Sequence, residues 1–271
     1  MLELCNITFG YNKKQPVLTD VSIMIEAGEF IAIAGQNGSG KTTVTRLLTA
    51  LKKPGSGSVL LYGQDAGAHS PADMARHIGY VFQNPDRQIF RDSVAREAAF
   101  GPEQLGFSAG QITEAVERAL ALTGLSELAD AYPSALSKGQ KQRLTIASAL
   151  AMQPKLLILD EPTSGQDGCE RQKLLELLVQ LHSQGVAILL VTHDMELIAR
   201  YPLRVIVMAE GKKVFDGTPR QLFSGKYPIA KWSLRYPPAT EIGRDLFPGE
   251  QAVMSMDELC QRLEAKLGGE R

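Results

Sequence analysis

Short apolar stretches alternate with segments of helical periodicity over the first 217 residues of the chain. Strands are predicted where apolar residues run continuously or alternate with polar ones, and helices where they recur at three- and four-residue steps. The predicted strands are 2–8, 21–26, 30–35, 58–62, 78–82, 155–160, 186–191, 203–209 and 212–216, and the helices between them are 41–51, 72–77, 170–183 and 195–200. Fully apolar strands separated by helices indicate an α/β fold with a largely parallel sheet covered on both faces.

Two regions depart from this alternation. Residues 84–152 show helical periodicity alone, which indicates an inserted helical subdomain. After Gly217 the sequence becomes rich in proline and aromatic residues, and it ends in a helix whose Ser255 and Glu258 have capping-box spacing. The apolar face of that last helix comprises Met256, Leu259, Cys260, Leu263 and Leu267. We therefore predict one domain over 1–217 and a small C-terminal domain over 218–271.

The composition is that of an ordinary globular protein, with 271 residues, 44% hydrophobic and 22% charged. A formal net charge of −1 gives no reason to expect a nucleic-acid partner. Three scattered cysteines predict reduced thiols and no disulfide. No basic and apolar leader opens the sequence, and the apolar runs are far shorter than the ~20 residues that span a bilayer. We expect a protein that is neither secreted nor membrane-spanning, although it could dock on one that is.

A phosphate-binding loop is the strongest chemical signal. The stretch "GQNGSGKT", residues 35–42, fits G-x-x-x-x-G-K-[ST] between a predicted strand and a predicted helix. Its backbone N–H groups would wrap a phosphate, Lys41 would reach the β- and γ-phosphates, and Thr42 would ligate Mg²⁺. A glycine-rich turn beside a surface lysine is the simpler alternative, and the strand–loop–helix context argues against it. The residues assigned to nucleotide binding here are Gly35, Asn37, Gly38, Ser39, Gly40, Lys41, Thr42 and Thr43.

Polar residues follow three more apolar strands. Asp160 ends the strand 155–160 and is predicted to hold Mg²⁺, while Glu161 would accept a proton from an attacking water. His193 follows strand 186–191 as a candidate γ-phosphate sensor. Gln83 follows strand 78–82, where its amide would contact both Mg²⁺ and the water. Alone, an acidic strand end is usually a solvated loop and a single histidine is usually structural. Beside a phosphate loop the catalytic interpretation is favoured.

A second anion site is predicted at the start of another helix. Ser137, Gly139 and Gln140 lie in "SALSKGQKQRL", where a polar loop runs directly into an apolar-periodic helix. The first turn of a helix has unpaired N–H groups and a partial positive charge, which suit a phosphate.

Together these motifs resemble the nucleotide-binding subunits of ABC transporters, over roughly residues 2–225. The resemblance implies a P-loop NTPase fold of the ABC-ATPase type, with an antiparallel N-terminal β region and a mostly parallel core sheet. It also implies ATP, Mg²⁺ and a second ATPase subunit, which is either another copy of this chain or a homologue. "LSKGQ" is similar to the signature loop LSGGQ, which in that family binds the γ-phosphate of ATP held by the other subunit. Two departures are Lys138 for glycine and Gln166 for a common leucine, while the acid Asp167 is retained.

Within the family, the sequence most resembles the ATPases of energy-coupling factor transporters, which import vitamins and metals such as cobalt and nickel. "FQNPDRQIF" (82–90), with its second glutamine Gln88, and "PPATEIGRDLF" (237–247) carry this resemblance. It implies a C-terminal contact between ATPases, a transmembrane scaffold, a substrate-binding membrane subunit and a place on the cytoplasmic face of the membrane. Tyr11 stands where such proteins stack an aromatic ring on adenine. A plain strand-end tyrosine is its alternative.

Other classes of ATP-binding protein fit this sequence less well. Chromosome-organising ATPases separate the two half-sites by long coiled coils, and no heptad repeat lies between Lys41 and Ser137. Translation-type ABC proteins carry two cassettes and basic linkers. A non-hydrolysing switch is disfavoured by Glu161 and His193. The ATPase of a conventional importer with a solute-binding protein shares every catalytic motif and remains the alternative.

Overall fold

The computed structural model describes residues 1–12 and 15–268 of the chain. Its strands are β1 Leu2–Phe9, β2 Leu18–Ile25, β3 Phe30–Ala34, β4 Ser56–Leu61, β5 Gln64–Asp65, β6 Ile78–Val81, β7 Leu156–Asp160, β8 Ala187–Val191, β9 Arg204–Ala209 and β10 Lys212–Gly217. The α-helices are α1 Lys41–Leu48, α2 Pro71–Ala75, α3 Val94–Gln104, α4 Ala109–Thr123, α5 Lys138–Ala151, α6 Gly168–Ser183, α7 Met195–Arg200, α8 Pro219–Leu222, α9 Pro238–Leu246 and α10 Met256–Gly268.

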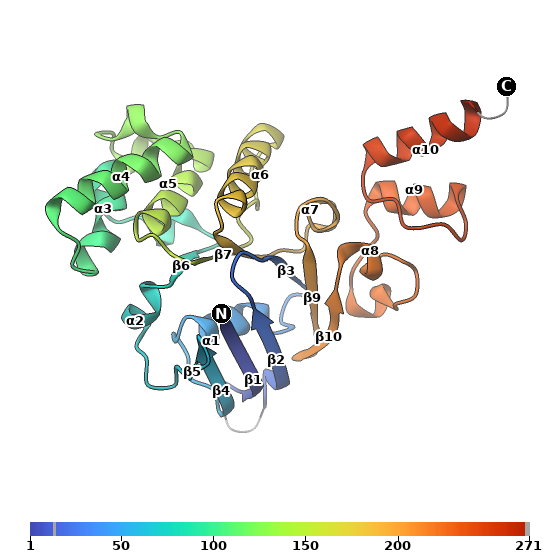
Figure 1. Ribbon diagram of the computed structural model, residues 1–271, viewed down its shortest axis with the longest axis horizontal. Coiled ribbons are helices and arrows are strands. Elements are labelled where there is room, and N and C mark those ends of the chain that lie inside the picture. The colour runs from blue at the N-terminus through green and yellow to red at the C-terminus, as the bar shows by residue number, and fades with distance from the viewer. Residues whose placement is uncertain (13–14, 269–271) are drawn as a thin grey trace.

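The strands form two sheets, as Figure 1 shows. An antiparallel sheet has the order β2–β1–β4–β5, and the core sheet has the order β10–β9–β3–β8–β7–β6. All neighbouring pairs in the core sheet are parallel except β9 and β10. The carboxyl ends of β3, β8, β7 and β6 therefore meet at one edge. The predicted α/β architecture is confirmed.

Both faces of the core sheet are covered. Every residue of β3, β7 and β8 is buried, as expected for parallel strands between two layers. Alternate residues face opposite sides: Ile31 and Ile33 pack with α1 and the antiparallel sheet, while Leu157 and Leu159 pack with α5 and α6. Neighbouring apolar residues along one strand therefore pack against different layers of the structure.

The helical insertion consists of α3, α4 and α5, which pack around their own apolar cluster and stand to one side of the sheet in Figure 1. The periodicity over residues 93–130 predicted helix throughout, but the structure breaks it at Gly106, which has φ +78°, and restarts it at Ser108, whose hydroxyl caps α4. The predicted helix 41–51 likewise ends early, at Leu48, because Ala50 turns to φ +56°. No helix in the described ranges combines the length and apolarity that crossing a membrane requires.

The C-terminal segment packs in two parts. Leu222, Phe223 and Leu234 share a cluster with Val205 and Val207 of β9, so this part extends the core of the sheet. A separate small cluster joins α9 and α10 and comprises Ala239, Phe247, Val253 and Leu259, with Leu263 packed against it. Of the predicted apolar face of the last helix, only Leu259 and Leu263 are covered by this packing. The exposed members are Met256, Cys260 and Leu267.

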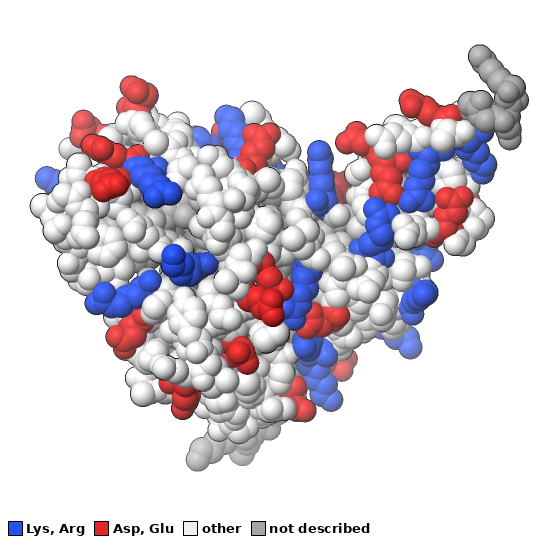
Figure 2. Space-filling model, viewed as in Figure 1, with Lys and Arg blue, Asp and Glu red and all other residues white. Residues whose placement is uncertain are grey.

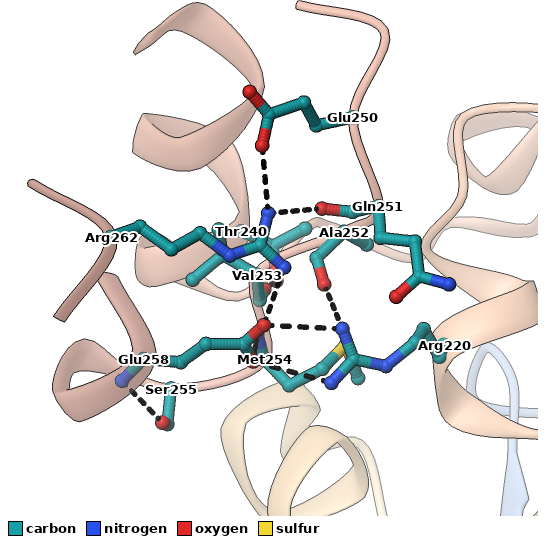
Figure 3. A network of polar contacts seen from close by, with 10 residues as sticks. All are labelled: Arg220, Thr240, Glu250, Gln251, Ala252, Val253, Met254, Ser255, Glu258 and Arg262. Carbon is teal, nitrogen blue, oxygen red and sulfur yellow. Dashed lines mark hydrogen bonds and ion pairs between the residues drawn. The ribbon is translucent and has the colours of Figure 1, made fainter. Parts of the chain in front are cut away.

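Polar contacts connect α8 to α10 (Figure 3). The Glu258 carboxylate accepts hydrogen bonds from Arg220, from Arg262 at 2.6 Å and from the Met254 N–H at 3.0 Å. Ser255 Oγ accepts from the Glu258 N–H at 3.1 Å, so half of the predicted capping box is present. The other half would be a hydrogen bond from the Ser255 N–H to the Glu258 carboxylate, which instead accepts from the two arginines and Met254. On the face in Figure 2, basic and acidic side chains alternate over this region.

Replacing Glu258 with glutamine should loosen this end of the molecule at neutral pH. Burial alone would raise the pKa of Glu258, but the hydrogen bonds from Arg220, Met254 and Arg262 lower it below its ordinary 4.5. A carboxyl whose pKa falls on folding contributes stability above its unfolded pKa and loses it as pH falls through the folded value. Glu258→Gln should therefore lower the thermal midpoint at pH 7 by about 2–4 °C.

Thermal unfolding measured from pH 7 down to pH 3 checks this. The difference in thermal midpoint between Glu258→Gln and the wild type should disappear as the pH falls below 4.5. Glu264→Gln, an exposed change on the same helix, is the matched control. An equal shift in both variants, or a gap that widens in acid, would contradict the assignment.

Candidate functional site

Four neighbouring strands deliver the predicted catalytic residues to one edge of the core sheet. The phosphate loop follows β3, His193 follows β8, Glu161 follows β7 and Gln83 follows β6. Two backbone hydrogen bonds continue the ladder past the strand ends, from Thr192 N to Ile33 O and from Glu161 N to Val191 O. The residues around the resulting open pocket of about 440 Å³ are Tyr11, Val17, Asn37, Gly38, Gly40, Lys41, Thr42, Thr43, Gln83, Asp160, Glu161 and His193.

The loop itself is shaped to curl around an anion. Gly35 has φ +142°, and a Cβ there would lie 2.1 Å from Met208 O. Gly40 has φ +104°, and a Cβ there would lie 2.4 Å from Leu18 Cδ2. Lys41 Nζ donates to the Gly35 carbonyl at 2.7 Å, inside the curl. Burial lowers the pKa of Lys41, although the charges of Glu161 and Asp160 act to raise it. The two glycines therefore permit a curled backbone in which the Lys41 ammonium lies close to the loop carbonyls.

Ser39 provides a direct test of fit for a phosphate. Its Oγ is buried and has no hydrogen-bond partner among the described residues. A buried hydroxyl without a partner is costly, and a phosphate oxygen would satisfy it. The loop residues therefore fit a nucleotide phosphate.

A buried carboxylate lies beside the loop. Asp160 Oδ2 accepts from Thr42 Oγ1 at 3.3 Å and from the Tyr80 hydroxyl at 3.4 Å, and Tyr80 also contacts Thr45 at 3.2 Å. Burial raises the pKa of Asp160, and it raises the pKa of Tyr80 to about 12. A carboxylate, a hydroxyl and the Gln83 amide are hard oxygen donors of the kind Mg²⁺ prefers. The residues present fit that ion.

Tyr80 was not among the predicted site residues. It lies within the strand "IGYVF", where an aromatic residue needs no explanation beyond packing. Only the pairing of β6 with β7, which sets Tyr80 opposite Ile158, brings its hydroxyl to Asp160. No sequence signal indicates that contact.

Glu161 and His193 form a pair. His193 Nδ1 lies 2.7 Å from Glu161 Oε1, with the glutamate side chain 10% exposed and the imidazole 70% exposed. A carboxylate oxygen accepts, so the imidazole Nδ1–H is the donor when this contact is a hydrogen bond to ionised Glu161. Glu161 has φ +49°, an uncommon backbone conformation for a residue with a side chain. The turn after β7 therefore aims this carboxylate back toward the histidine.

Tyr11 forms a wall of the pocket. Its ring is 52% exposed and packs edge-on against Phe9, with centroids 5.1 Å apart. Its hydroxyl accepts from Arg46 Nη1 at 2.9 Å and lies 3.4 Å from Thr43 Oγ1. Burial would raise the pKa of Tyr11, but these two contacts and the nearby positive charges lower it. These contacts hold the Tyr11 ring beside the phosphate loop, and the Lys52 ammonium lies over the ring, 5.8 Å from its centroid.

The second predicted anion site lies apart from this pocket. Ser137 caps α5, where its Oγ accepts from Gln140 N at 3.2 Å and the Gln140 side chain returns a bond to Ser137 N. Asp167 caps α6 in the same manner, accepting from Glu170 N at 2.9 Å. None of Ser137, Gly139, Gln140 and Asp167 lines the phosphate-loop pocket. One chain alone therefore does not bring Ser137 to the phosphate loop, although its neighbour Lys138 lines an adjoining cavity of about 630 Å³ together with Thr42, Gln83 and Asp160.

Asp160→Asn should stabilise the protein in the absence of nucleotide. Because burial raises the pKa of Asp160 above its ordinary 3.8, the ionised carboxylate weakens the folded state at pH 7. The amide should raise the thermal midpoint by about 2–4 °C at pH 7, with no gain below pH 3.8, where the wild-type carboxyl is neutral in both states. Thermal unfolding with exposed Asp245→Asn as control checks this. A lower midpoint in Asp160→Asn would show that its contacts outweigh its burial.

Comparison with known proteins assigns the chain to a family. The model of the ABC transporter family matches residues 18–164, a segment that begins with β2 and includes the phosphate loop, the signature loop and Glu161. The energy-coupling factor transporter ATP-binding protein EcfA2 of Caldanaerobacter subterraneus is 38% identical over 97% of this chain and 96% of its own length. Three putative ABC transporter ATP-binding proteins, 37–44% identical, are longer, and the chain spans 35–45% of each.

Solved structures agree with these relatives. CbiO1 of Clostridium perfringens, described as part of the ABC transporter complex cbiONQ, has a TM-score of 0.78 and 35% identity over 90% of this chain and 98% of its own. A dimeric ATP-binding cassette solved with ADP and phosphate has a TM-score of 0.71 and 28% identity over 81% of this chain and 99% of its own. With a matching family model over half its length and full-length relatives of this similarity, the chain belongs to the ATP-binding proteins of the ABC transporter family.

Proposed function

We propose that the chain hydrolyses ATP as a subunit of an energy-coupling factor importer, in a dimer of ATPase subunits. The observation that carries this is the division of the predicted phosphate contacts. Lys41, Glu161 and His193 line one pocket, while Ser137 lies on a separate exposed surface of the same chain. Two such chains arranged head to tail would complete two pockets, each with a phosphate loop from one chain and a signature loop from the other.

The signature loop has unused capacity for a phosphate. The Ser137 hydroxyl oxygen accepts one bond inside the capping box, so its O–H proton is free to donate to an anion. The 14-residue helix α5 adds unpaired N–H groups and the positive end of its dipole at the same point. The dimeric cassette with ADP and phosphate supports the two-chain arrangement by analogy.

Hydrolysis would proceed by in-line attack of water on the γ-phosphorus. Glu161 would orient that water and accept its proton, and the 2.7 Å contact with His193 fixes the direction of the carboxylate. Lys41 and His193 would stabilise the charge on the transferring group, so positioning and electrostatics provide most of the rate. Thr42, Asp160 and Gln83 would hold Mg²⁺, which supplies charge neutralisation at the phosphates. Tyr11 would stack on adenine.

The importer subtype rests on the segment after Gln83. Gln88 folds back on the strand end, accepting from Phe82 N at 3.1 Å and donating to Tyr80 O at 3.4 Å. This second glutamine therefore braces the segment that begins at Gln83, where motion in the nucleotide site would pass to a membrane partner. The similarity to EcfA2 and cbiO1 supports a vitamin or a transition-metal ion such as cobalt or nickel as cargo.

The membrane partners would be a transmembrane scaffold and a substrate-binding membrane subunit, with this chain on the cytoplasmic face of the membrane. The C-terminal domain predicted over residues 218–271 would keep the ATPases associated when ATP is absent, with Phe247 and Leu259 in its internal apolar cluster. Purification of the native complex and identification of its subunits tests the subtype. A scaffold with a small substrate-binding membrane protein supports it, whereas a solute-binding protein would indicate a conventional importer.

Glu161→Gln should bind ATP and lose turnover by about 10²–10⁴-fold, the usual contribution of a positioned general base. The amide keeps the size of the side chain but accepts no proton. Steady-state ATPase assays and ATP-binding measurements on the same preparation check this. Hydrolysis at the wild-type rate in Glu161→Gln would remove Glu161 from the role of base.

Mixed dimers test the composite pocket. Lys41→Ala should disable the pocket of its own chain, and Ser137→Ala should disable that of its partner. A dimer with one chain of each kind keeps one intact pocket, so mixing the two inactive variants should restore part of the ATPase activity. Full activity of each variant alone, or no recovery on mixing while both still dimerise, would contradict the shared pocket.

A further inference from the structure

The first turn of α5 contacts the turn before α6 through Lys138, the residue that departs from the family pattern. Lys138 Nζ donates to the Gly165 carbonyl at 3.1 Å. Within residues 1–12 and 15–268 this carbonyl is the only polar partner of the Lys138 ammonium. A charged donor makes a stronger hydrogen bond than a neutral one. A glycine at position 138 has no side chain and could not make this contact.

The two helix starts also fit closely. A Cβ added at Gly165, which has φ +67°, would lie 2.3 Å from Lys138 Nζ, and one added at Gly139 would lie 2.3 Å from Glu170 Oε2. Arg143 of α5 forms an ion pair with the same Glu170 of α6. The signature loop is thus fastened to the segment 162–167 of its own chain.

That segment is a short hydrogen-bonded turn which begins at the proposed base. Ser164 N donates to Glu161 O at 3.1 Å, and Gln166 N donates to Thr163 O at 3.3 Å. Asp167 then caps α6. Three residues and the hydrogen bond from Ser164 N to Glu161 O join Gly165 to Glu161, so a displacement of the Gly165 carbonyl would bear on the position of Glu161 and its contact with His193.

We propose that Lys138 is a positioning residue that couples the two ATP sites of the dimer. The proposal rests on the proposed function. When Ser137 contacts ATP held by the partner, the neighbouring Lys138 moves with it and, through Gly165, sets the Glu161 carboxylate over the ATP of its own chain. Occupancy of one site thereby promotes hydrolysis at the other. In this scheme Lys138 acts without touching a phosphate.

The test compares Lys138→Met with Lys138→Arg and with Lys173→Met. Methionine keeps the length of the stem without the charge, and arginine restores a donor. Lys173 pairs with the same Glu170 and, among the residues that the structure describes, forms no hydrogen bond or ion pair with segment 162–167, so it is the matched control. Two measurements are made on each full-length protein: amide hydrogen exchange of segment 162–167 without nucleotide, and ATPase rate against ATP concentration in the assembled dimer.

Lys138→Met should exchange faster over 162–167, reduce kcat about fivefold to tenfold and lower the Hill coefficient for ATP from above 1 to about 1, with KM little changed. Lys138→Arg should recover all three properties, and Lys173→Met should leave them as in the wild type.

Four results would overturn the proposal. One is unchanged exchange in Lys138→Met, and another is a wild-type Hill coefficient of about 1 in an active dimer. A raised KM with kcat and cooperativity intact would instead place the Lys138 ammonium on the phosphate of the partner's ATP. If the wild-type dimer hydrolyses no ATP, the proposed function is refuted, and the coupling role of Lys138 with it. Faster exchange over 162–167 in Lys138→Met would in that case still support the Lys138–Gly165 contact.

Discussion

The parallel alignment of β3, β8, β7 and β6 is the constraint on which the rest of the structure depends. Each strand is buried between two layers, and each ends at the same edge with a loop that carries one chemical group. The register that pairs Ile33 with Val191 and Leu159 with Leu190 brings His193 within hydrogen-bond reach of Glu161, and Thr42 within reach of Asp160. Catalytic geometry is therefore a consequence of strand packing, which a rigid core maintains to a fraction of an ångström.

The site is built at a cost in stability. It buries Lys41, Asp160 and Glu161 and leaves the Ser39 hydroxyl without a partner. Burial moves the pKa of Lys41 down and that of Asp160 up, so both groups are held in an environment that disfavours their charges. A nucleotide with its metal ion would supply the missing partners, and ligand binding would then stabilise the fold. Function and stability compete at this edge of the sheet.

The separation of Ser137 from the phosphate loop is the feature on which the proposed two-chain site depends. In the proposed dimer, an incomplete pocket in one chain would make hydrolysis depend on a second chain, and the contact from Lys138 to Gly165 would give each chain a route between the two pockets. The network around Glu258 ties α10 to α8 and hence to the sheet through Phe223. Side-chain contacts therefore link both the signature loop and the C-terminal helix α10 to segments that pack on the core sheet.

The sequence alone determined the strand-and-helix order, the phosphate loop, the strand-end residues Asp160, Glu161 and His193, and the family. Local signals suffice there, because glycine requirements, apolar runs and motif spacing act over a few residues. Only the tertiary structure decided which loops meet. Tyr80 reaches Asp160 through strand pairing, Lys138 reaches Gly165 across 27 residues, and Glu258 binds Arg220 instead of completing its capping box. Such contacts join segments distant in the chain, and no local pattern encodes them.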